Sequence, residues 1–356
     1  VNTAGLDFYQ RLVDLLLETG IQPFVTLHHW DLPAALDDRG GWLNPESAAW
    51  FGEYAWVVVR ALGDRVQHWV TINEPWVITH DGYVTGMHPP GRPSVSSAPL
   101  VAHNLLRAHG TAVQVYRAEA RGQIGLVVNL EPKYPASDAP ADLAATARAD
   151  AYMNRQYLDP VFRGSYPAEM PEIFGAAWPR FPAADFALIR EPIDFLGVNY
   201  YTRGVTRNDD HALPVRAAKV VQPQSLYTEM DWEVWPEALT RVLRWTKDHY
   251  GDIPLYVTEN GAAFADPPPV AGRVDDPLRV DYLRTHLRAV QDAIACGVDL
   301  RGYFAWSLLD NLEWAEGTSK RFGLVQVDFA NQLRTPKASA DFYRDVIRTR
   351  GAALET

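Results

Sequence analysis

Apolar positions along this chain alternate between two periodicities. Residues 3–19 carry leucines at helical spacing, and Gly20 closes the segment. A short continuous apolar run follows at 23–27. This pair predicts a helix and then a strand buried on both faces, because a strand with one solvated face would alternate apolar and polar residues.

The same pattern recurs along the sequence. We expect further helices at 46–62, 99–121, within 139–190, at 236–250, 277–296 and 336–350, and further strands at 66–73, 123–130, 193–201, 253–260 and 300–307. Helices alternating with buried strands are typical of an α/β fold with a parallel sheet. No linker or low-complexity stretch divides the chain, so we expect residues 1–356 to form a single domain.

Composition narrows the class of protein. Apolar residues make up 47% of the chain and charged residues 22%, which excludes a disordered protein. The net charge of −11 and the scattered basic residues do not suit a nucleic-acid partner. No run of 18 apolar residues exists to span a membrane. The 12 tryptophans offer flat faces on which sugar rings stack, although tryptophan also fills cores.

Cys296 is the single cysteine. It cannot form an internal disulfide, which favours a reducing, cytoplasmic compartment. No histidine motif accompanies it, so we expect no metal site and interpret Cys296 as a small buried apolar residue.

Polar and aromatic residues follow the predicted strands where each strand ends. In a barrel of parallel strands, the carboxyl ends meet at one mouth, so these side chains are expected to converge. We count six such strands, whereas closure takes eight. The residues concerned are His29, Trp30, Asn73, Glu74, Asn199, Tyr201, Glu259, Asn260 and Trp306.

Two of these residues are glutamates in similar settings. Glu74 lies in TINEP (71–75) and Glu259 in VTENG (257–261), each beside an asparagine. Glycosidic bonds are usually cut by a pair of carboxyl groups, one of which protonates the departing oxygen. The other attacks the anomeric carbon or activates water. A lone glutamate at a strand end is more often a solvated loop residue, but the matched pair favours catalysis.

The neighbours assign different tasks to the two carboxyl groups. The Asn73 amide is suited to a sugar 2-hydroxyl, a contact that strengthens in the transition state. We expect Tyr201 to donate its hydroxyl to Glu259, which lowers the carboxylate pKa and keeps a nucleophile ionised. Glu74 needs an apolar setting that keeps it protonated. Trp69 and Trp76 flank it in sequence.

The chain resembles glycoside hydrolase family 1, the β-glucosidase family, up to about residue 345. The resemblance implies a (β/α)8 TIM barrel and a double displacement that retains β configuration, with Glu74 as acid/base and Glu259 as nucleophile. The matching segments are GLDFY (5–9), PFVTLHHWDLP (23–33), DRGGW (38–42), TINEPW (71–76), DFLGVNYYTR (194–203), YVTENGAAF (256–264) and YFAWSLLDNLEWAEGTSKRFGLVQVDF (303–329).

The resemblance also implies the sugar-binding residues. His29 and Asn73 would hold hydroxyls of the glycone, the sugar that is released, and Trp306 would lie under its ring. Glu313 and Trp314 would bind its far hydroxyls, Trp232 would wall the entrance, and Phe322 would line the inner pocket. Trp30, Asn199 and Tyr201 complete the predicted site. His28, by contrast, is predicted to be structural.

Substrate class follows from the same comparison. Relatives that act on 6-phosphorylated sugars typically carry serine where this chain has Glu313, and a carboxylate there disfavours a phosphate. Plant thioglucosidases carry glutamine in place of Glu74. We therefore expect small neutral β-glucosides or cello-oligosaccharides as substrates, and no cofactor.

Three alternatives stay open. An endo-acting barrel enzyme such as a cellulase would need an open cleft, and a sugar-binding pseudo-enzyme would usually lack one of the glutamates. The third is an inactive fragment. Family members begin with two further βα units, so the chain would supply only strands 3 to 8, without an arginine beside the nucleophile. A missing N-terminal segment or a homo-oligomer would then cover the open sheet edges.

Overall fold

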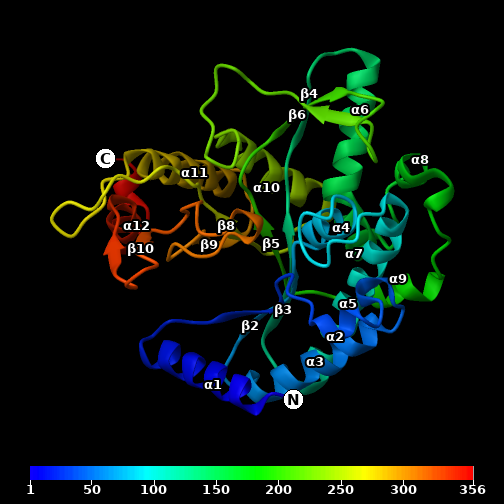
Figure 1. Cartoon of the computed structure of the whole chain (residues 1–356), viewed down its shortest axis with the longest axis horizontal. Helices are drawn as coiled ribbons and strands as arrows, with labels where there is room; N and C mark the ends of the chain where they lie inside the picture. Colours follow the sequence, from blue (N-terminus) through cyan, green and yellow to red (C-terminus); the bar gives the residue numbers. More distant parts are fainter. Residues whose placement is uncertain (356) are drawn as a thin grey trace. The chain divides into compact units, whose positions relative to one another are not determined.

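The computed structural model describes residues 1–355. Helices alternate with short strands along the chain (Figure 1). The main helices are α1 (Thr3–Glu18), α2 (Ala34–Asp37), α3 (Ser47–Leu62), α4 (Pro75–Tyr83), α5 (Ala98–Glu119), α6 (Pro140–Asp150), α7 (Gln156–Arg163), α8 (Met170–Phe174), α9 (Ala183–Ile189), α10 (Glu237–Tyr250), α11 (Pro277–Ala295) and α12 (Ala338–Arg348).

Six strands form one hydrogen-bonded sheet. Their order across the sheet, β1-β2-β3-β5-β8-β9, is the same as their order in the sequence. The prediction of a parallel α/β sheet is confirmed. The strands of the chain are β1 (Phe24–His28), β2 (His68–Asn73), β3 (Gln123–Asn129), β4 (Lys133–Pro135), β5 (Phe195–Asn199), β6 (Gly204–Asn208), β7 (Ala217–Lys219), β8 (Leu255–Asn260), β9 (Leu300–Ala305), β10 (Val325–Val327) and β11 (Arg334–Pro336).

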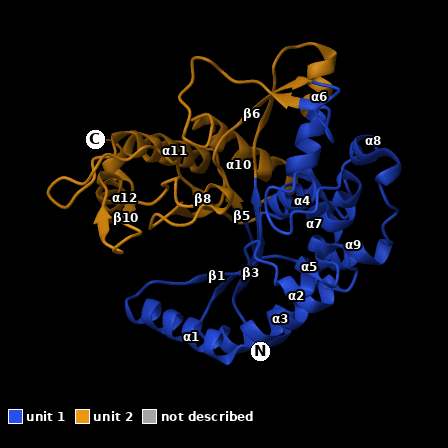
Figure 2. Ribbon diagram, in the orientation of Figure 1, with its two compact units in different colours: residues 1–129, 147–197, 209–217 blue, residues 130–146, 198–208, 218–356 orange. Residues whose placement is uncertain are grey.

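Two compact units contain these elements (Figure 2). The chain passes between them several times, and the prediction of a single domain stays a prediction. Unit 1 comprises residues 1–129, 147–197 and 209–217, and unit 2 comprises residues 130–146, 198–208 and 218–355 of the described chain.

Unit 1 is built on β1, β2 and β3, which pair in parallel. Helix α3 packs on α5, and it buries Phe51, Ala55, Val59 and Leu62. Those positions recur at the three- and four-residue spacing that places side chains on one face of a helix. Strands β2 and β3 are buried at nearly every position, as expected where both faces of a sheet are covered, whereas Thr26 of β1 is exposed, so the prediction that this strand is buried on both faces is wrong.

Unit 2 contains β8 and β9, which also pair in parallel, and an antiparallel pair formed by β10 and β11. Helices α10 and α11 pack together, and the Thr240 hydroxyl of α10 donates a 2.8 Å hydrogen bond to the Ala289 carbonyl of α11. Leu283 and Leu287 of α11 join Leu324 and Val346 in a buried cluster. This packing supports the carboxyl ends of β8 and β9.

The structure adds elements that periodicity did not predict. Helix α4 begins directly after the TINEP glutamate, where Pro75 occupies the first helical turn. The 139–190 region is divided into α6, α7, α8 and α9, with a π-helical turn at 151–155. Such short segments lack the sustained periodicity on which the prediction relied.

One sequence expectation about a side chain needs correction, and one helix exposes much of its apolar surface. Helix α1 forms as predicted, but Val13 is its one buried residue, and large apolar side chains such as Phe8 and Leu15 are more than half exposed. Cys296 is exposed rather than buried. It is the residue that caps the C-terminus of α11, where the chain leaves the helix, so no packed layer covers it.

Candidate active site

The first group of predicted site residues lies in unit 1, at the carboxyl end of β2. Asn73 is the last residue of this strand, and Glu74 follows it with a left-handed backbone conformation (φ 48°, ψ 66°). The Glu74 amide still donates to the Val127 carbonyl at 2.9 Å. Both side chains are buried, at 3% and 5% exposure. This backbone conformation is uncommon for a residue other than glycine. It sets the direction in which the Glu74 side chain projects from the end of the strand.

His29 and Asn73 contact each other in this group. The Asn73 Nδ2 lies 3.2 Å from His29 Nε2. An amide NH2 group can only donate, so Nε2 accepts the hydrogen bond and the ring proton lies on Nδ1. Burial lowers the pKa of His29 to about 4, and Asp31 opposes this effect. The imidazole is therefore neutral at physiological pH and can serve as a hydrogen-bond donor through Nδ1.

Trp30 secures the same strand end. Its backbone φ of 81° is in the left-handed region, and its indole Nε1 donates to the Asn73 carbonyl at 3.0 Å. The ring stacks on His88, with 5.4 Å between centroids. Trp30 thus fixes the backbone from which Asn73 and Glu74 project, and His88 is a contributor that sequence reasoning missed.

Three side chains of unit 1, those of His28, Trp69 and Trp76, make packing or backbone contacts that are consistent with a structural role. His28 is buried beside the rings of Trp42 and Phe51. Trp69 is fully buried and donates from Nε1 to the Val66 carbonyl. Trp76 stacks on His80 of α4, with 4.5 Å between centroids.

The second group lies in unit 2 around Glu259, in β8. The Tyr201 hydroxyl donates to Glu259 Oε2 at 2.6 Å, the contact expected from the sequence. The Tyr200 amide donates to the Glu259 carbonyl at 3.0 Å. Next to it, the Thr258 hydroxyl donates to Asn199 Oδ1 at 2.6 Å. These bonds tie the residues that end β5 to both the backbone and the carboxylate of Glu259.

The contacts of Asn260 and Gly261 explain why a glycine occupies position 261. Asn260 is fully buried, and its amide donates to the Tyr200 carbonyl and the Tyr282 hydroxyl. Its carbonyl accepts from the Trp306 amide at 2.9 Å. A Cβ on Gly261 would lie 1.8 Å from the Trp306 carbonyl oxygen. Only glycine permits this backbone approach, which sets Trp306 beside the end of β8.

An aromatic cluster surrounds Tyr201. The Trp232 ring lies 4.8 Å from the Tyr201 ring, and the Phe322 ring lies 6.3 Å from it in an edge-to-face arrangement. Trp232 and Phe322 are 6.0 Å apart. Phe322 is buried and Trp232 is half-buried. The three rings bring apolar surface to the hydroxyl that binds Glu259.

Glu313 and Trp314 lie on the segment that follows β9. Burial raises the pKa of Glu313 to about 7, while a hydrogen bond with the Trp306 side chain opposes the shift. The Glu313 amide donates to the Gly317 carbonyl at 2.6 Å, and Trp314 has φ 36° in this tight turn. The structure thus connects Glu313 to Trp306, two residues that the sequence resemblance places against the same sugar.

The twelve predicted site residues therefore form a group within each unit. Unit 1 brings together His29, Trp30, Asn73 and Glu74, whereas unit 2 brings together Asn199, Tyr201, Trp232, Glu259, Trp306, Glu313, Trp314 and Phe322. Sequence reasoning missed Thr258, although a hydroxyl beside the nucleophile in VTENG was visible.

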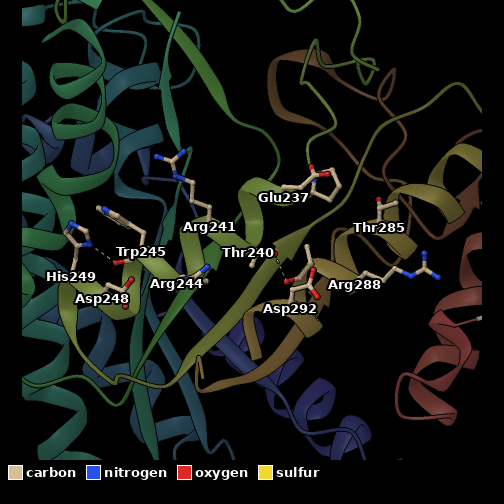
Figure 3. Close-up of a pocket in the computed structure, with 12 residues that line it drawn as sticks. Glu237, Thr240, Arg241, Arg244, Trp245, Asp248, His249, Thr285, Arg288 and Asp292 are labelled. Atoms are coloured by element: carbon tan, nitrogen blue, oxygen red, sulfur yellow. Dashed lines mark hydrogen bonds between the residues drawn. The ribbon is translucent and has the colours of Figure 1, made fainter. Parts of the chain in front are cut away.

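A cavity of about 750 Å³ lies elsewhere in unit 2, between α10 and α11 (Figure 3). Trp245 and His249 project along it from α10, and Arg288 and Asp292 from α11. None of the predicted site residues lines it. In residues 1–355, no cluster of three histidine, cysteine or acidic side chains is arranged to hold a metal ion. No helix of that range is both long and apolar enough to cross a membrane.

Comparisons with known proteins agree on one family. Residues 1–352 match the model of glycosyl hydrolase family 1. The chain is 45% identical over 355 residues to beta-glucosidase A of Thermotoga maritima, covering 99% of this chain and 79% of that protein. It is 44% identical over 353 residues to a 1,4-beta-D-glucan glucohydrolase of Thermotoga neapolitana, with the same coverage.

A solved structure gives the same result. The beta-glucosidase of Thermotoga maritima in complex with deoxynojirimycin superimposes with a TM-score of 0.96 at 44% identity. The match covers 99% of this chain and 79% of that one.

Proposed function

The chain belongs to glycosyl hydrolase family 1, and from that premise we propose that Glu259 is its catalytic nucleophile and Glu74 its acid/base. The protein is a retaining β-glycosidase of the β-glucosidase type. The observation that carries the assignment of Glu259 is the 2.6 Å hydrogen bond from Tyr201 to its carboxylate. A donor stabilises the ionised form, which is the form a nucleophile needs.

The two glutamates act in succession in this mechanism. Glu259 attacks the anomeric carbon while Glu74 donates its proton to the departing glycosidic oxygen, and a covalent glycosyl-enzyme forms. Glu74, now ionised, removes a proton from water, which displaces Glu259 from the sugar. Two inversions at one carbon retain the β configuration.

Binding residues divide by the part of the sugar that they hold. Neutral His29 and buried Asn73 are assigned to glycone hydroxyls, Asn73 to the 2-hydroxyl. Trp306 lies under the ring, and its bond to Glu313 supports joint binding of the far hydroxyls by Glu313 and Trp314. Trp232 and Phe322 supply apolar walls near Tyr201.

Two further site residues act indirectly. Trp30 holds the Asn73 backbone, and Asn199 is held by Thr258 next to the nucleophile. Each position is restrained by a part-buried hydrogen bond that joins it to a residue of a neighbouring strand.

We assign small neutral β-glucosides, including cello-oligosaccharides, as substrates. The names of the Thermotoga relatives, beta-glucosidase and 1,4-beta-D-glucan glucohydrolase, support this class. The half-buried Glu313 carboxylate would repel a phosphate on the glycone. Removal of one terminal sugar predicts a higher rate on cellobiose than on carboxymethyl-cellulose, whereas an endo-acting enzyme would prefer the polymer.

We further propose that strands bordering β1 and β9 complete an eight-stranded barrel. None of the six residues of β9 is buried, whereas five of the six residues of β2 are. A strand inside a closed barrel would be covered on both sides. Intact mass and solution size of the purified protein test this proposal: a mass well above 39.9 kDa supports additional strands, and a dimer of that mass supports a second copy instead.

Substitution of the two glutamates tests the mechanism. Glu259→Ala should abolish hydrolysis of an aryl β-glucoside. Glu74→Ala should slow it strongly, and azide should restore turnover by attacking the glycosyl-enzyme without needing a general base. The azide product should have β configuration, because azide attacks the face from which the leaving group departed.

A matched control distinguishes the loss of a catalytic carboxylate from the loss of any buried carboxylate. Glu233 is a carboxylate of unit 2 at 2% exposure that pairs with Arg203 at 2.9 Å and accepts from the Ser225 hydroxyl. Glu233→Gln should affect thermal stability without abolishing turnover. If Glu259→Ala kept wild-type activity, or azide left Glu74→Ala unchanged, the assignment would be wrong.

A further inference from the structure

Residues 306–327, here called the glycone loop, follow β9 in unit 2. The loop has an outgoing arm and a returning arm, which are hydrogen-bonded to each other. The Leu324 amide donates to the Ser307 carbonyl at 2.8 Å. The Asp310 amide donates to the Val325 carbonyl at 3.0 Å. Glu313 and Trp314 lie beyond these pairs, in the turn at the far end of the loop. The pairing of the arms therefore sets where the turn begins.

The Asp310 carboxylate bonds to the returning arm and to Lys337, which lies beyond the loop. Oδ1 accepts from the Gly323 amide at 2.9 Å, and Oδ2 accepts from Arg321 Nη1 at 2.8 Å and from the Val327 amide at 3.3 Å. Lys337 Nζ donates to Oδ1 at 3.0 Å. The Asp310 side chain is fully buried. One carboxylate thus satisfies four donors, three of them on the returning arm.

The two arms are also in direct backbone contact at this point. A Cβ on Gly323 would lie 2.2 Å from the Asp310 amide nitrogen. The glycine leaves no space between the arms, so the carboxylate reaches its donors without intervening atoms.

The outgoing arm contributes little apolar packing around Asp310. Leu308 and Leu312, which flank Asp310 in sequence, are 68% and 62% exposed. Apolar side chains left in solvent contribute little to ordering a segment. The polar contacts of Asp310 therefore restrain the outgoing arm, from which the turn that carries Glu313 extends.

The same contacts continue toward the nucleophile. Lys337 pairs with Asp266 at 2.5 Å, and Asp266 pairs with Arg279 at 2.8 Å. Arg279 donates to the Ala262 carbonyl at 3.2 Å. Ala262 follows Glu259 by three residues. Asp310 in the glycone loop and Ala262 near Glu259 are therefore connected by one network of buried ion pairs and hydrogen bonds.

We propose that Asp310 is a positioning residue for substrate specificity, which acts on the sugar through Glu313 and Trp314. This inference rests on the proposed role of those two residues at the far hydroxyls of the glycone. Asp310 touches no substrate. It holds the loop so that the Glu313 carboxylate stands at a fixed place relative to β8, and the enzyme thereby distinguishes sugars by the substituent at their far end.

Two aryl glycosides that differ at that end test the inference. An aryl β-xyloside lacks the hydroxymethyl group of the corresponding β-glucoside. For Asp310→Asn, the ratio of kcat/KM on glucoside to kcat/KM on xyloside should fall at least about tenfold, because a displaced Glu313 loses its contact with the glucoside alone. A purely structural effect would lower both values by the same factor.

Two other variants keep the experiment interpretable. Glu233→Gln is the matched control: this carboxylate is buried and pairs with Arg203 and Ser225, which lie outside both the glycone loop and the Asp310–Arg279 network. It should leave the ratio at the wild-type value. If Asp310→Asn does not fold, Arg321→Lys alters the contact from the other side. The Arg321 side chain is 30% exposed, and its Nη1 donates to both Asp310 and the Val327 carbonyl, a geometry that lysine does not reproduce, so the same drop in ratio is expected.

The outcomes separate the inference from its premise. Glu313→Ala should lower the same ratio if Glu313 binds the far hydroxyls. A lowered ratio in Glu313→Ala with an unchanged ratio in folded Asp310→Asn or Arg321→Lys would overturn the inference and leave the function intact. An unchanged ratio in Glu313→Ala would overturn the role of Glu313 itself.

Discussion

The Tyr201 hydroxyl donates a 2.6 Å hydrogen bond to Oε2 of Glu259, and so connects the residue two positions beyond β5 with the penultimate residue of β8. Trp232 and Phe322 surround the donor with apolar rings. A hydrogen bond to a charged oxygen is stronger when water is kept away. The contact orients the Glu259 carboxylate, and we expect a donor at this oxygen to favour the ionised form.

Tyr201→Phe should lower kcat/KM on an aryl β-glucoside about tenfold or more, since a hydrogen bond to a charged group contributes roughly 1.5–3 kcal/mol. The acid limb of the kcat/KM profile should also move to higher pH. The hydroxyl stabilises the charged carboxylate, so protonation becomes easier without it. A pH–rate profile from pH 4 to 8 measures both effects.

Tyr200→Phe is the control for this substitution. The Tyr200 hydroxyl is also buried, but it donates to the Trp235 carbonyl rather than to a carboxylate. Its loss should reduce stability and leave the acid limb in place. An unshifted limb in Tyr201→Phe would show that the hydroxyl has no part in the ionisation of Glu259.

Glu313→Gln should stabilise the protein more at pH 8 than at pH 4. The pKa of Glu313 is raised from 4.5 to about 7, mainly by burial. Below pH 4.5 the side chain is protonated in both folded and unfolded states and costs nothing. As pH rises toward 7, the unfolded state loses this proton first, so the folded state is progressively disfavoured.

The expected difference in the free energy of unfolding between variant and wild type is about 1 to 2 kcal/mol larger at pH 8, because the side chain is partly exposed and solvent screens the charge. Urea denaturation at the two pH values measures it. Equal differences at pH 4 and pH 8 would contradict the raised pKa.

Asn73→Ala should reduce kcat/KM on an aryl β-glucoside by a factor of about 100, mostly through kcat, if the amide binds the 2-hydroxyl more tightly in the transition state. The amide is buried and oriented by His29 at 3.2 Å. The matching 2-deoxy glucoside should be cleaved at nearly equal rates by the variant and the wild type. Equal losses of kcat/KM on both substrates would show that Asn73 does not act through the 2-hydroxyl.

Gly261→Ala should cost more than about 3 kcal/mol of stability or displace Trp306, because the new Cβ would overlap the Trp306 carbonyl at 1.8 Å. Thermal unfolding and tryptophan fluorescence measure the two effects. Gly5→Ala is the control, since that helical glycine faces only the Asn2 side chain at 3.4 Å and alanine favours the helix. A normal melting temperature for Gly261→Ala would refute the close approach.

Cys296 should react with a thiol reagent in the native protein at one equivalent per chain, because it is exposed. Activity should be unchanged after modification. Cys296 precedes β9, whereas Trp306 and Glu313 follow that strand. Reaction only after denaturation would restore the interpretation of a buried cysteine.

The sequence alone determined the class of fold and supplied the proposed catalytic pair. Strands such as β3 and β5 appear as continuous apolar runs, and helices such as α3 show their period, because both patterns follow from local geometry and burial. Glu74 and Glu259 were identified because short motifs preserve the residues on either side of a strand end.

The sequence anticipated the contact of Tyr201 with Glu259, but tertiary structure alone decided most of the other contacts between side chains. The bonds of Asp310 to Gly323 and Arg321 and the approach of Trp306 to Gly261 join residues far apart in the chain, and no local pattern encodes the distance between them. The exposure of Cys296 and the raised pKa of Glu313 have the same origin, since burial is a property of the whole packed unit. The sequence thus supplied the candidate reacting groups, and folding set the environment in which those side chains lie.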